Sequence, residues 1–189
     1  SAMALINLGY ANFYFWDGRA ATLEDQIYQP VRNPIEMHDT WPNVVSKLQS
    51  TPAYPPLFAD AFGSSTIDSV KVVKAMAQFL RTLISGNSKY DKVKRGEAAF
   101  TIDEAEGLTL FGLEGGPVGM QIPLAGGGFV VGQGGADCFH CHTEATGLFT
   151  DEQAHNNGLD SEPFPDLGRG AITSDPFENP ESDVCSCHT

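Results

Sequence analysis

Residues 67–85 read IDSVKVVKAMAQFLRTLIS, and this stretch decides the class of the fold. Its apolar residues recur at steps of three and four: Ile67, Val70, Val73, Ala77, Leu80 and Ile84. That spacing predicts an amphipathic helix with one buried face. Gly86 follows where the C-terminal cap of a helix is expected.

Shorter helices are predicted on both sides of this one. Thr22, with Asp25 three residues later, resembles a capping box and opens a short helix that ends near Tyr28. Three prolines within the next fourteen residues then predict a stiff, extended loop over residues 29–40. Further helices are expected over residues 41–49, 57–62 and 101–112, the last opened by the capping box of Thr101 and Glu104.

The remaining segments lack helical or strand periodicity. Residues 87–96 read as a charged connection, and residues 114–135 are rich in glycine, which favours a long loop or a small hairpin. The tail from Asn156 is mostly irregular. The sequence therefore predicts a mostly α protein with long irregular loops rich in glycine and proline.

The charge balance excludes some functions. The 189 residues contain 11 Lys and Arg against 24 Asp and Glu, which gives a net charge of -13. Nucleic-acid binding rests largely on basic residues that neutralise phosphates, so no nucleic-acid partner is expected. No apolar run approaches the roughly 20 residues of a membrane helix.

The cysteines form two local pairs, Cys138 with Cys141 and Cys185 with Cys187. The first lies in CFHCH, which matches Cys-x-x-Cys-His, the attachment pattern of haem c. Two thiols at this spacing can each add to one vinyl group of the porphyrin, and His142 is then placed as the axial ligand of the iron.

Two other interpretations of the cysteines remain open. Cys138 and Cys141 could form a tetrahedral zinc site with Cys185 and either Cys187 or His188, and Cys138 with Cys141 could form a disulfide or a redox-active dithiol. The second pair is one residue short of a haem motif. His140, inside the motif, is expected to be a surface residue rather than a ligand.

Several other segments resemble the bacterial di-haem cytochrome c peroxidase family. They are FWDGRA at 15–20, TLEDQ at 22–26, NPIEM at 33–37, QFLRTL at 78–83, SKYD at 88–91, FTD at 149–151 and HNNGL at 155–159. These matches keep the order of the family and extend from Leu5 to about Thr173.

The resemblance implies helical domains like those of class-I cytochromes c, each with one covalent haem. Residues 1–96 would be the C-terminal part of the lobe whose haem reacts with peroxide, so this first lobe is expected to be incomplete. Residues 97–189 would be the lobe whose haem receives electrons. The chain is thus expected to be an internal part of a longer protein, with one haem here and two in the parent.

The resemblance also implies roles for single residues. Glu36 matches the acid–base carboxylate of the peroxide site, Gln26 the amide that orients peroxide or water, and Trp16 the aromatic residue between the two haems. Without the resemblance, these would be read as a loop acid, a residue on a helix surface and a core aromatic. His155 is expected either to contact the second haem or to cap a turn, and no methionine is assigned as sixth ligand.

The implied function is the reduction of hydrogen peroxide to water in the periplasm, with electrons from a small cytochrome c or copper protein. This part alone is expected to be inactive, and the resemblance admits calcium and a homodimer in the parent. Alternatives are a mono-haem electron-transfer module without enzymatic activity, the di-haem branch that oxidises a protein-bound tryptophan product, and a zinc-stabilised binding domain.

Overall fold

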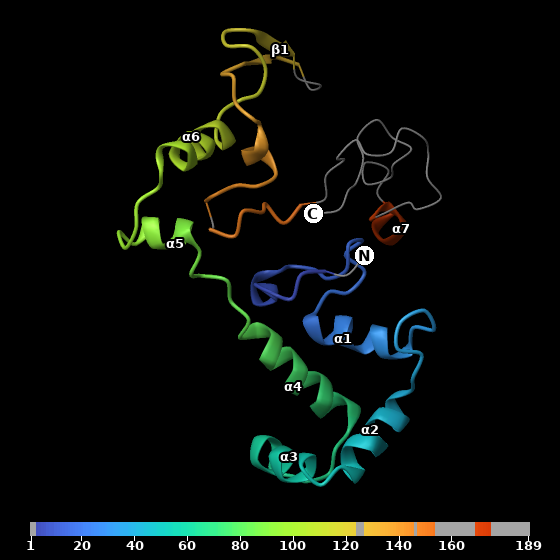
Figure 1. The fold of residues 1–189 in the computed structure, drawn as a ribbon. Coiled ribbons are helices and arrows are strands. Elements are labelled where there is room, and N and C mark those ends of the chain that lie inside the picture. Colours follow the sequence, from blue (N-terminus) through green and yellow to red (C-terminus); the bar gives the residue numbers. More distant parts are fainter. Residues whose placement is uncertain (1–2, 124–126, 146, 154–168, 175–189) are drawn as a thin grey trace. The chain divides into compact units, whose positions relative to one another are not determined.

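The computed structural model describes residues 3–123, 127–145, 147–153 and 169–174 (Figure 1). Within these residues helices dominate and strand is limited to one small hairpin, so the predicted mostly α class is confirmed. The elements are η1 (Leu8–Tyr10), α1 (Leu23–Arg32), α2 (Trp41–Ser50), α3 (Tyr54–Phe62), α4 (Ser69–Arg81), α5 (Lys89–Lys94), α6 (Ile102–Phe111), β1 (Gln121–Pro123), β2 (Phe129–Val131), η2 (Cys138–His140) and α7 (Gly170–Thr173).

The described residues form two compact units. The first contains residues 3–84 and 169–174, and the second contains residues 85–153. The predicted lobes, residues 1–96 and 97–189, stay a prediction.

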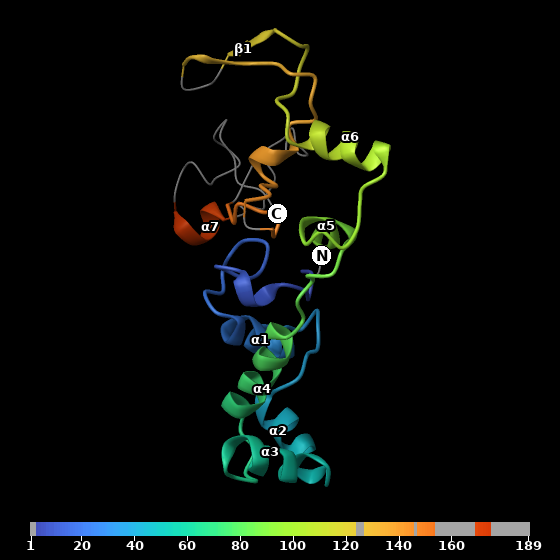
Figure 2. The same cartoon turned by 90° about the vertical axis from the view of Figure 1, so that its left-hand side faces the viewer.

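The hydrophobic core lies in the first unit. Helix α1 packs against α4, and α2 packs against both α3 and α4, as the views in Figures 1 and 2 allow the reader to follow. The buried hydrophobic residues are Leu8, Tyr14, Ala20, Leu23, Ile27, Val31, Trp41, Phe58, Ile67, Val72, Val73 and Ala77. Val44, Val45 and Leu48, the predicted apolar face of α2, are half-buried against this core.

Helix α4 confirms the opening prediction with two differences. Asp68 caps its start by accepting a hydrogen bond from the backbone of Lys71, and the helix ends at Arg81, before the predicted Gly86 cap. Val73 and Ala77 are buried as predicted, whereas Val70 is 51% exposed and Val72 is buried instead. The spacing of apolar residues predicts roughly which face of the helix is buried. Packing of α1 and α2 against α4 then determines which individual residues of that face are buried.

Helix α1 corrects the prediction for residues 29–40. Thr22 caps its start as predicted, but the helix continues through Pro30 to Arg32 because Ile27 and Val31 are buried in the core. The following segment is not extended. It turns back over the helix end, where Met37 N donates to Pro30 O at 3.2 Å and Asp39 N donates to Val31 O at 2.8 Å. These bonds satisfy carbonyls that the last helical turn leaves without partners.

The second unit contains one helix that the sequence analysis missed. Helix α5 lies in the predicted charged connection and begins with a full capping box, formed by Ser88 and Asp91. Helix α6 begins at the predicted capping box of Thr101 and Glu104.

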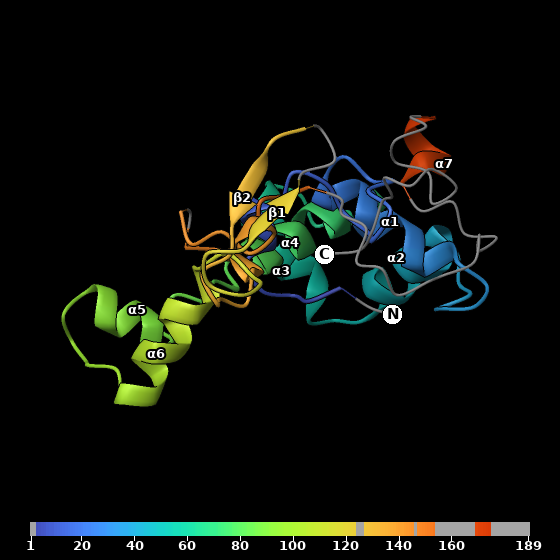
Figure 3. The same cartoon turned by 90° about the horizontal axis from the view of Figure 1, so that it is seen from above.

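The glycine-rich segment forms the small hairpin that was one of its two predicted outcomes. Strands β1 and β2 pair antiparallel with Ile122 opposite Val130, and they lie side by side in Figure 3. The backbone of Gly132 continues the pairing by donating to Met120 O at 2.8 Å. The chain therefore leaves α6, makes this excursion and returns directly to the Cys-x-x-Cys-His motif.

Candidate haem and peroxide sites

The Cys-x-x-Cys-His motif is built on η2 and the turn after it. Cys138 begins the 3-10 helix, and His142 N donates to Cys138 O at 2.9 Å, which closes the motif into one compact loop. Asp137 precedes it in the left-handed backbone region, at φ 61°. Cys138 and Cys141 are half-buried free thiols rather than a local disulfide. Burial raises the pKa of the Cys141 thiol, and the nearby carboxylates of Asp151 and Asp137 raise it further.

The imidazole of His142 is oriented by a main-chain contact. Its Nδ1 lies 2.9 Å from the carbonyl oxygen of Phe149. A carbonyl oxygen can only accept, so this contact needs the proton on Nδ1, and in the neutral imidazole Nε2 then has the free lone pair. This tautomer is the one that a histidine needs to bind a metal through Nε2, with its other nitrogen held by a backbone oxygen.

The Phe149 side chain belongs to a cluster of aromatic rings that does not form a closed core. The Phe149 ring packs edge-to-face on Tyr90, with centroids 4.8 Å apart, and on Phe111, at 5.8 Å. Phe100 lies beside Tyr90 at 6.3 Å. All four rings are only half-buried, and no hydrophobic side chain is buried among the described residues of 85–153. A planar apolar group attached at Cys138 and Cys141 fits such surroundings, so these residues fit haem c.

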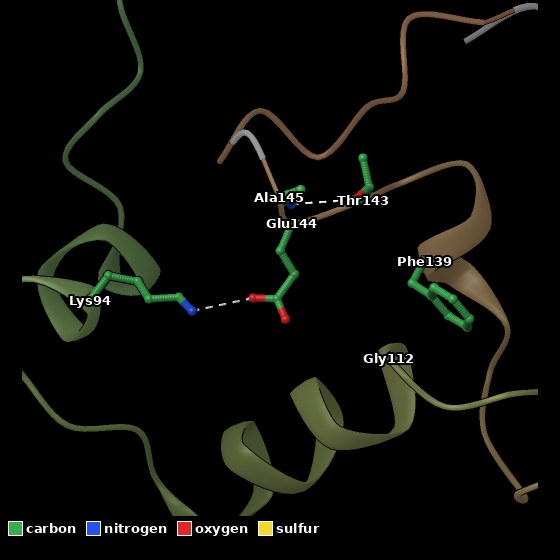
Figure 4. Close-up of a pocket in the computed structure, with 6 residues that line it drawn as sticks. All are labelled: Lys94, Gly112, Phe139, Thr143, Glu144 and Ala145. Atoms are coloured by element: carbon green, nitrogen blue, oxygen red, sulfur yellow. Dashed lines mark hydrogen bonds and ion pairs between the residues drawn. The ribbon is translucent and has the colours of Figure 1, made fainter.

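A pocket of about 420 Å³ lies beside the motif (Figure 4). Its lining comes from α5, from the end of α6, from the motif and from the three residues that follow it: Lys94, Gly112, Phe139, Thr143, Glu144 and Ala145. Figure 4 shows Lys94 and Glu144 pointing toward each other, with Nζ 3.4 Å from Oε2.

Glu144 ties the motif loop to α5. The Tyr90 hydroxyl donates to Glu144 Oε2, and this bond is the main reason that the pKa of Glu144 lies below its ordinary value. Burial and the same contact raise the pKa of Tyr90. Sequence reasoning missed this contact, because Tyr90 and Glu144 are 54 residues apart and no local pattern relates them.

The residues predicted for the peroxide site lie in the first unit, on segments attached to one helix. Gln26 is a half-buried residue of α1. Glu36 is exposed in the turn after α1, where its Oε1 accepts from Asn33 Nδ2 at 2.9 Å. Since Met37 N donates to Pro30 O, this turn is fastened one helical turn beyond Gln26.

Trp16 belongs to a turn that docks on the same part of α1. The turn is closed by the bridge between Tyr14 and Ala20, and Trp16 is half-buried in it. Arg19 Nε donates to Gln29 Oε1 at 3.1 Å, and the Arg19 guanidinium lies 3.6 Å from the centroid of the Phe15 ring. Trp16, Gln26 and Glu36 are thus carried by segments anchored to α1, and their roles stay predictions.

Some predicted residues lie elsewhere. His155, Cys185, Cys187 and His188 fall outside the described residues. The methionines that received no assignment, Met37, Met76 and Met120, are all exposed. Within the described residues, no helix combines the length and apolar character needed to cross a membrane.

The chain is similar to known proteins in sequence and in fold. The family model for di-haem cytochrome c peroxidase matches residues 1–99. The methylamine utilization protein MauG of Methylorubrum extorquens is 36% identical over 168 residues, which are 88% of this chain and 40% of that protein. The cytochrome c551 peroxidase of Nitrosomonas europaea is 37% identical over 112 residues, covering 59% of this chain and 34% of the relative.

A solved structure shares the fold over nearly all of the chain. A MauG-like protein associated with microbial copper homeostasis superposes with a TM-score of 0.74 and 27% identity, covering 95% of this chain and 52% of that one. The chain spans about two fifths of the length of the MauG relatives it matches. With its model matching more than half of the sequence, the chain belongs to the di-haem cytochrome c peroxidase family.

Proposed function

We propose that this chain is part of a periplasmic di-haem enzyme that reduces hydrogen peroxide to water, and that electrons enter at a haem c held by Cys138, Cys141 and His142. The observation that carries the proposal is the hydrogen bond between His142 Nδ1 and Phe149 O at 2.9 Å. It presents Nε2 as a ligand directly after two free thiols with the spacing for haem attachment.

Each residue of this motif has a separate task. The Cys138 and Cys141 thiols would each add their S–H across one vinyl double bond of the porphyrin and so hold the haem by two thioether bonds. The Phe149 carbonyl holds the His142 imidazole in one tautomer and one orientation. When bound, haem c supplies one-electron redox chemistry.

At the peroxide site, Glu36 would carry out the proton transfers. Its carboxylate would take a proton from one oxygen of hydrogen peroxide and return it to the leaving oxygen. Gln26 would orient the peroxide, and Trp16 would relay electrons between the two haems. Supporting this, all three are carried by segments anchored to α1, and the Glu36 carboxylate is exposed with only the Asn33 amide bound to it among the described residues.

Haem attachment is tested by producing the chain with the haem-attachment machinery and recording a pyridine haemochrome spectrum and an intact mass. We expect a mass increase of one haem and a bis-thioether spectrum. In the absorption spectrum of the folded protein, recorded without pyridine, His142→Ala should shift the haem bands through loss of the axial ligand, whereas the matched control His38→Asn, at an exposed histidine in the first unit, should leave them unchanged. A chain that gains zinc and shows no Soret band would contradict the proposal and support the zinc alternative.

Peroxide chemistry is tested in the full-length parent. Glu36→Gln keeps the size of the side chain and its contact with Asn33 but removes the base, so turnover should fall by about 10²–10⁴-fold with unchanged haem content. Asp60→Asn, at an exposed acid of α3, is the control. Equal turnover in Glu36→Gln and wild type would remove the role of Glu36. A haem-loaded parent that never consumes peroxide would favour the electron-transfer module.

The proposed donor is a small cytochrome c or a copper protein. The net charge of -13 favours a donor with a basic surface, whose association rate should fall as salt is added. Calcium and a homodimer in the parent belong to the same proposal. The periplasmic location follows from covalent haem attachment, which takes place outside the cytoplasm.

A second candidate rests on the MauG relatives, which match 88% of the chain at 36% and 33% identity. The parent would then oxidise a protein-bound tryptophan product and carry a tyrosine as sixth haem ligand in place of methionine. Oxidation of such a protein without turnover of a small electron donor would establish this candidate.

A further inference from the structure

Three ligand-bearing side chains converge beside the haem motif without belonging to it. His140 Nε2 lies 3.3 Å from Glu114 Oε1 and 3.2 Å from Asp137 Oδ1, and one ligand atom from each residue falls within 4.8 Å of the others. We propose that Glu114, Asp137 and His140 bind a divalent first-row transition-metal ion such as Zn²⁺. This gives His140 a role other than that of the surface residue expected from the sequence.

The separations match those of ligands around one ion. Bonds of about 2.0–2.2 Å to nitrogen and oxygen in tetrahedral geometry place neighbouring ligand atoms about 3.3 Å apart. The two distances from His140 Nε2 already have this value. The ligand oxygens of Glu114 and Asp137 lie within 4.8 Å of each other, so rotation of these side chains is the change that we expect when an ion binds.

The backbone holds the three residues together by closing the glycine-rich segment on itself. Gly135 N and Gln133 N both donate to Glu114 O, at 2.9 and 3.1 Å, and Asp137 N donates to Leu113 O at 3.2 Å. A side chain at Gly115 would place its Cβ 3.2 Å from Asp137 Cβ. The two chain segments thus cross with little room for a side chain at Gly115, and this crossing brings the two carboxylates to the same imidazole.

The negative charge of Glu114 and Asp137 is not balanced by a lysine or arginine of the described chain. In the part of the chain that the structure describes, Glu114 and Asp137 form ion pairs with His140 and with no lysine or arginine. The Glu114 side chain is only 20% exposed, so its carboxylate is partly shielded from water. Two carboxylates that share a single imidazole retain negative charge whether or not the imidazole is protonated, and a dication would neutralise it.

The donor set selects the class of ion. One imidazole nitrogen with two carboxylate oxygens suits zinc, copper and similar divalent ions, while calcium and magnesium prefer oxygen ligands alone. Three protein ligands leave at least one position for water, so the ion should be exchangeable. The site is also separate from the haem ligand, because His142 is turned to the Phe149 carbonyl.

The test is a calorimetric titration of the haem-loaded chain with Zn²⁺. In that form Cys138 and Cys141 are thioethers and His142 is an iron ligand, and alkylation with iodoacetamide blocks the remaining cysteines. We expect one saturable Zn²⁺ per chain. Loss of a residue that only supports a metal ligand weakens binding roughly 10–100-fold. We expect at least this loss of Zn²⁺ affinity when a ligand itself is replaced, in Glu114→Gln, Asp137→Asn and His140→Gln.

The control is Glu106→Gln, at an exposed acid of α6, which should bind Zn²⁺ as the wild type does. The Soret band of each variant reports haem and folding independently of zinc, so failure of haem attachment and failure of the metal site are distinguishable. A titration without a saturable site would overturn the proposal. So would equal affinities in wild type, Glu114→Gln and Asp137→Asn, since the cluster would then be an ion pair of protonated His140 only.

Discussion

Gly135 and Gly107 have opposite surroundings, although both lie in the second unit. A Cβ at Gly135 would come within 2.1 Å of the Leu113 carbonyl oxygen, whereas a Cβ at Gly107, in α6, would meet nothing within 4 Å. Gly135→Ala must therefore displace backbone, and we expect it to lower the free energy of unfolding by about 1–3 kcal/mol. Gly107→Ala should raise it by about 0.5–1 kcal/mol, because alanine is the better helix former.

Urea unfolding of the two variants, followed by circular dichroism, measures both changes. The pair serves as its own control, since each replaces a glycine by the same residue. A destabilisation of equal size at both positions would contradict the close approach at Gly135.

Asp39 offers a test of electrostatics at one side chain. Its carboxylate accepts hydrogen bonds from Lys47 Nζ, Asn43 Nδ2 and Thr40 N, at 2.8, 2.6 and 2.7 Å, and these lower its pKa from 3.8 to about 2. Lys47 is the largest cause. Lys47→Met should therefore raise the pKa of Asp39 toward 3.8, while the other two donors keep it below that value.

A carboxyl NMR titration measures this pKa. Since the folded pKa is the lower one, the stabilising contribution of Asp39 is present above its unfolded pKa and is lost as the pH falls through the folded value. Lys92→Met, in the second unit, is the control. An unchanged titration of Asp39 in Lys47→Met would show that the two amide donors suffice.

At the scale of elements, α1 and α4 are joined by a bidentate ion pair. Arg81 Nη1 and Nη2 lie 2.8 and 2.9 Å from Glu24 Oε1 and Oε2, and both side chains are about one third exposed. The hydrogen bond from Arg81 lowers the pKa of Glu24 below 4.5. A double-mutant cycle with Glu24→Gln and Arg81→Met should give a coupling energy of at most about 1 kcal/mol at neutral pH.

The pH dependence of this coupling has a definite direction. As the pH falls, the unfolded chain takes up its proton near the ordinary pKa of 4.5 and the folded chain only at a lower pH, so the coupling persists above 4.5 and disappears below the folded pKa. Urea unfolding across this range measures it. A coupling energy that stays constant into acid would mean that packing of the arginine stem, and not charge, links the helices.

The elements also show what a sequence can and cannot predict. Local signals sufficed for α6, whose capping box lies within four residues, and the capping box of Ser88 and Asp91 would have located α5 as well. Pro30 led to the wrong prediction that the helix ends near Tyr28. A proline inside a helix is unfavourable, but here burial of the same turn of α1 in the core outweighs this. Burial of a residue depends on contacts with residues that are distant in sequence, so the neighbouring residues do not predict it.

In the candidate sites, too, local features could be predicted from the sequence and contacts made by the fold could not. Cys138, Cys141 and His142 are adjacent in sequence, so the attachment pattern could be read directly. The Phe149 carbonyl that orients His142 is a backbone group, and no residue type reports it. Glu114 contacts His140 only because the glycine-rich segment folds back on itself. The sequence predicted either a loop or a hairpin for this segment, so it did not predict the contact.

At the scale of the whole molecule, hydrophobic burial is uneven. Every buried hydrophobic residue of the described chain lies between Leu8 and Ala77, in the first unit. The second unit instead has a cluster of half-buried aromatic rings that includes Phe149, the residue whose carbonyl oxygen contacts His142. A unit without its own buried side chains gains little from the hydrophobic effect, so a bound haem should contribute much of its stability.

Hydrogen exchange of the chain with and without attached haem tests this division. Haem attachment should increase protection in residues 85–153, most of all in α6 and the turn around Phe149, because the aromatic rings then pack on the porphyrin. Residues 23–81 should change little, since α1 and α4 already share a buried core. If protection in α6 is the same with and without haem, the second unit is stable by itself and its aromatic rings are not the haem surroundings that we propose.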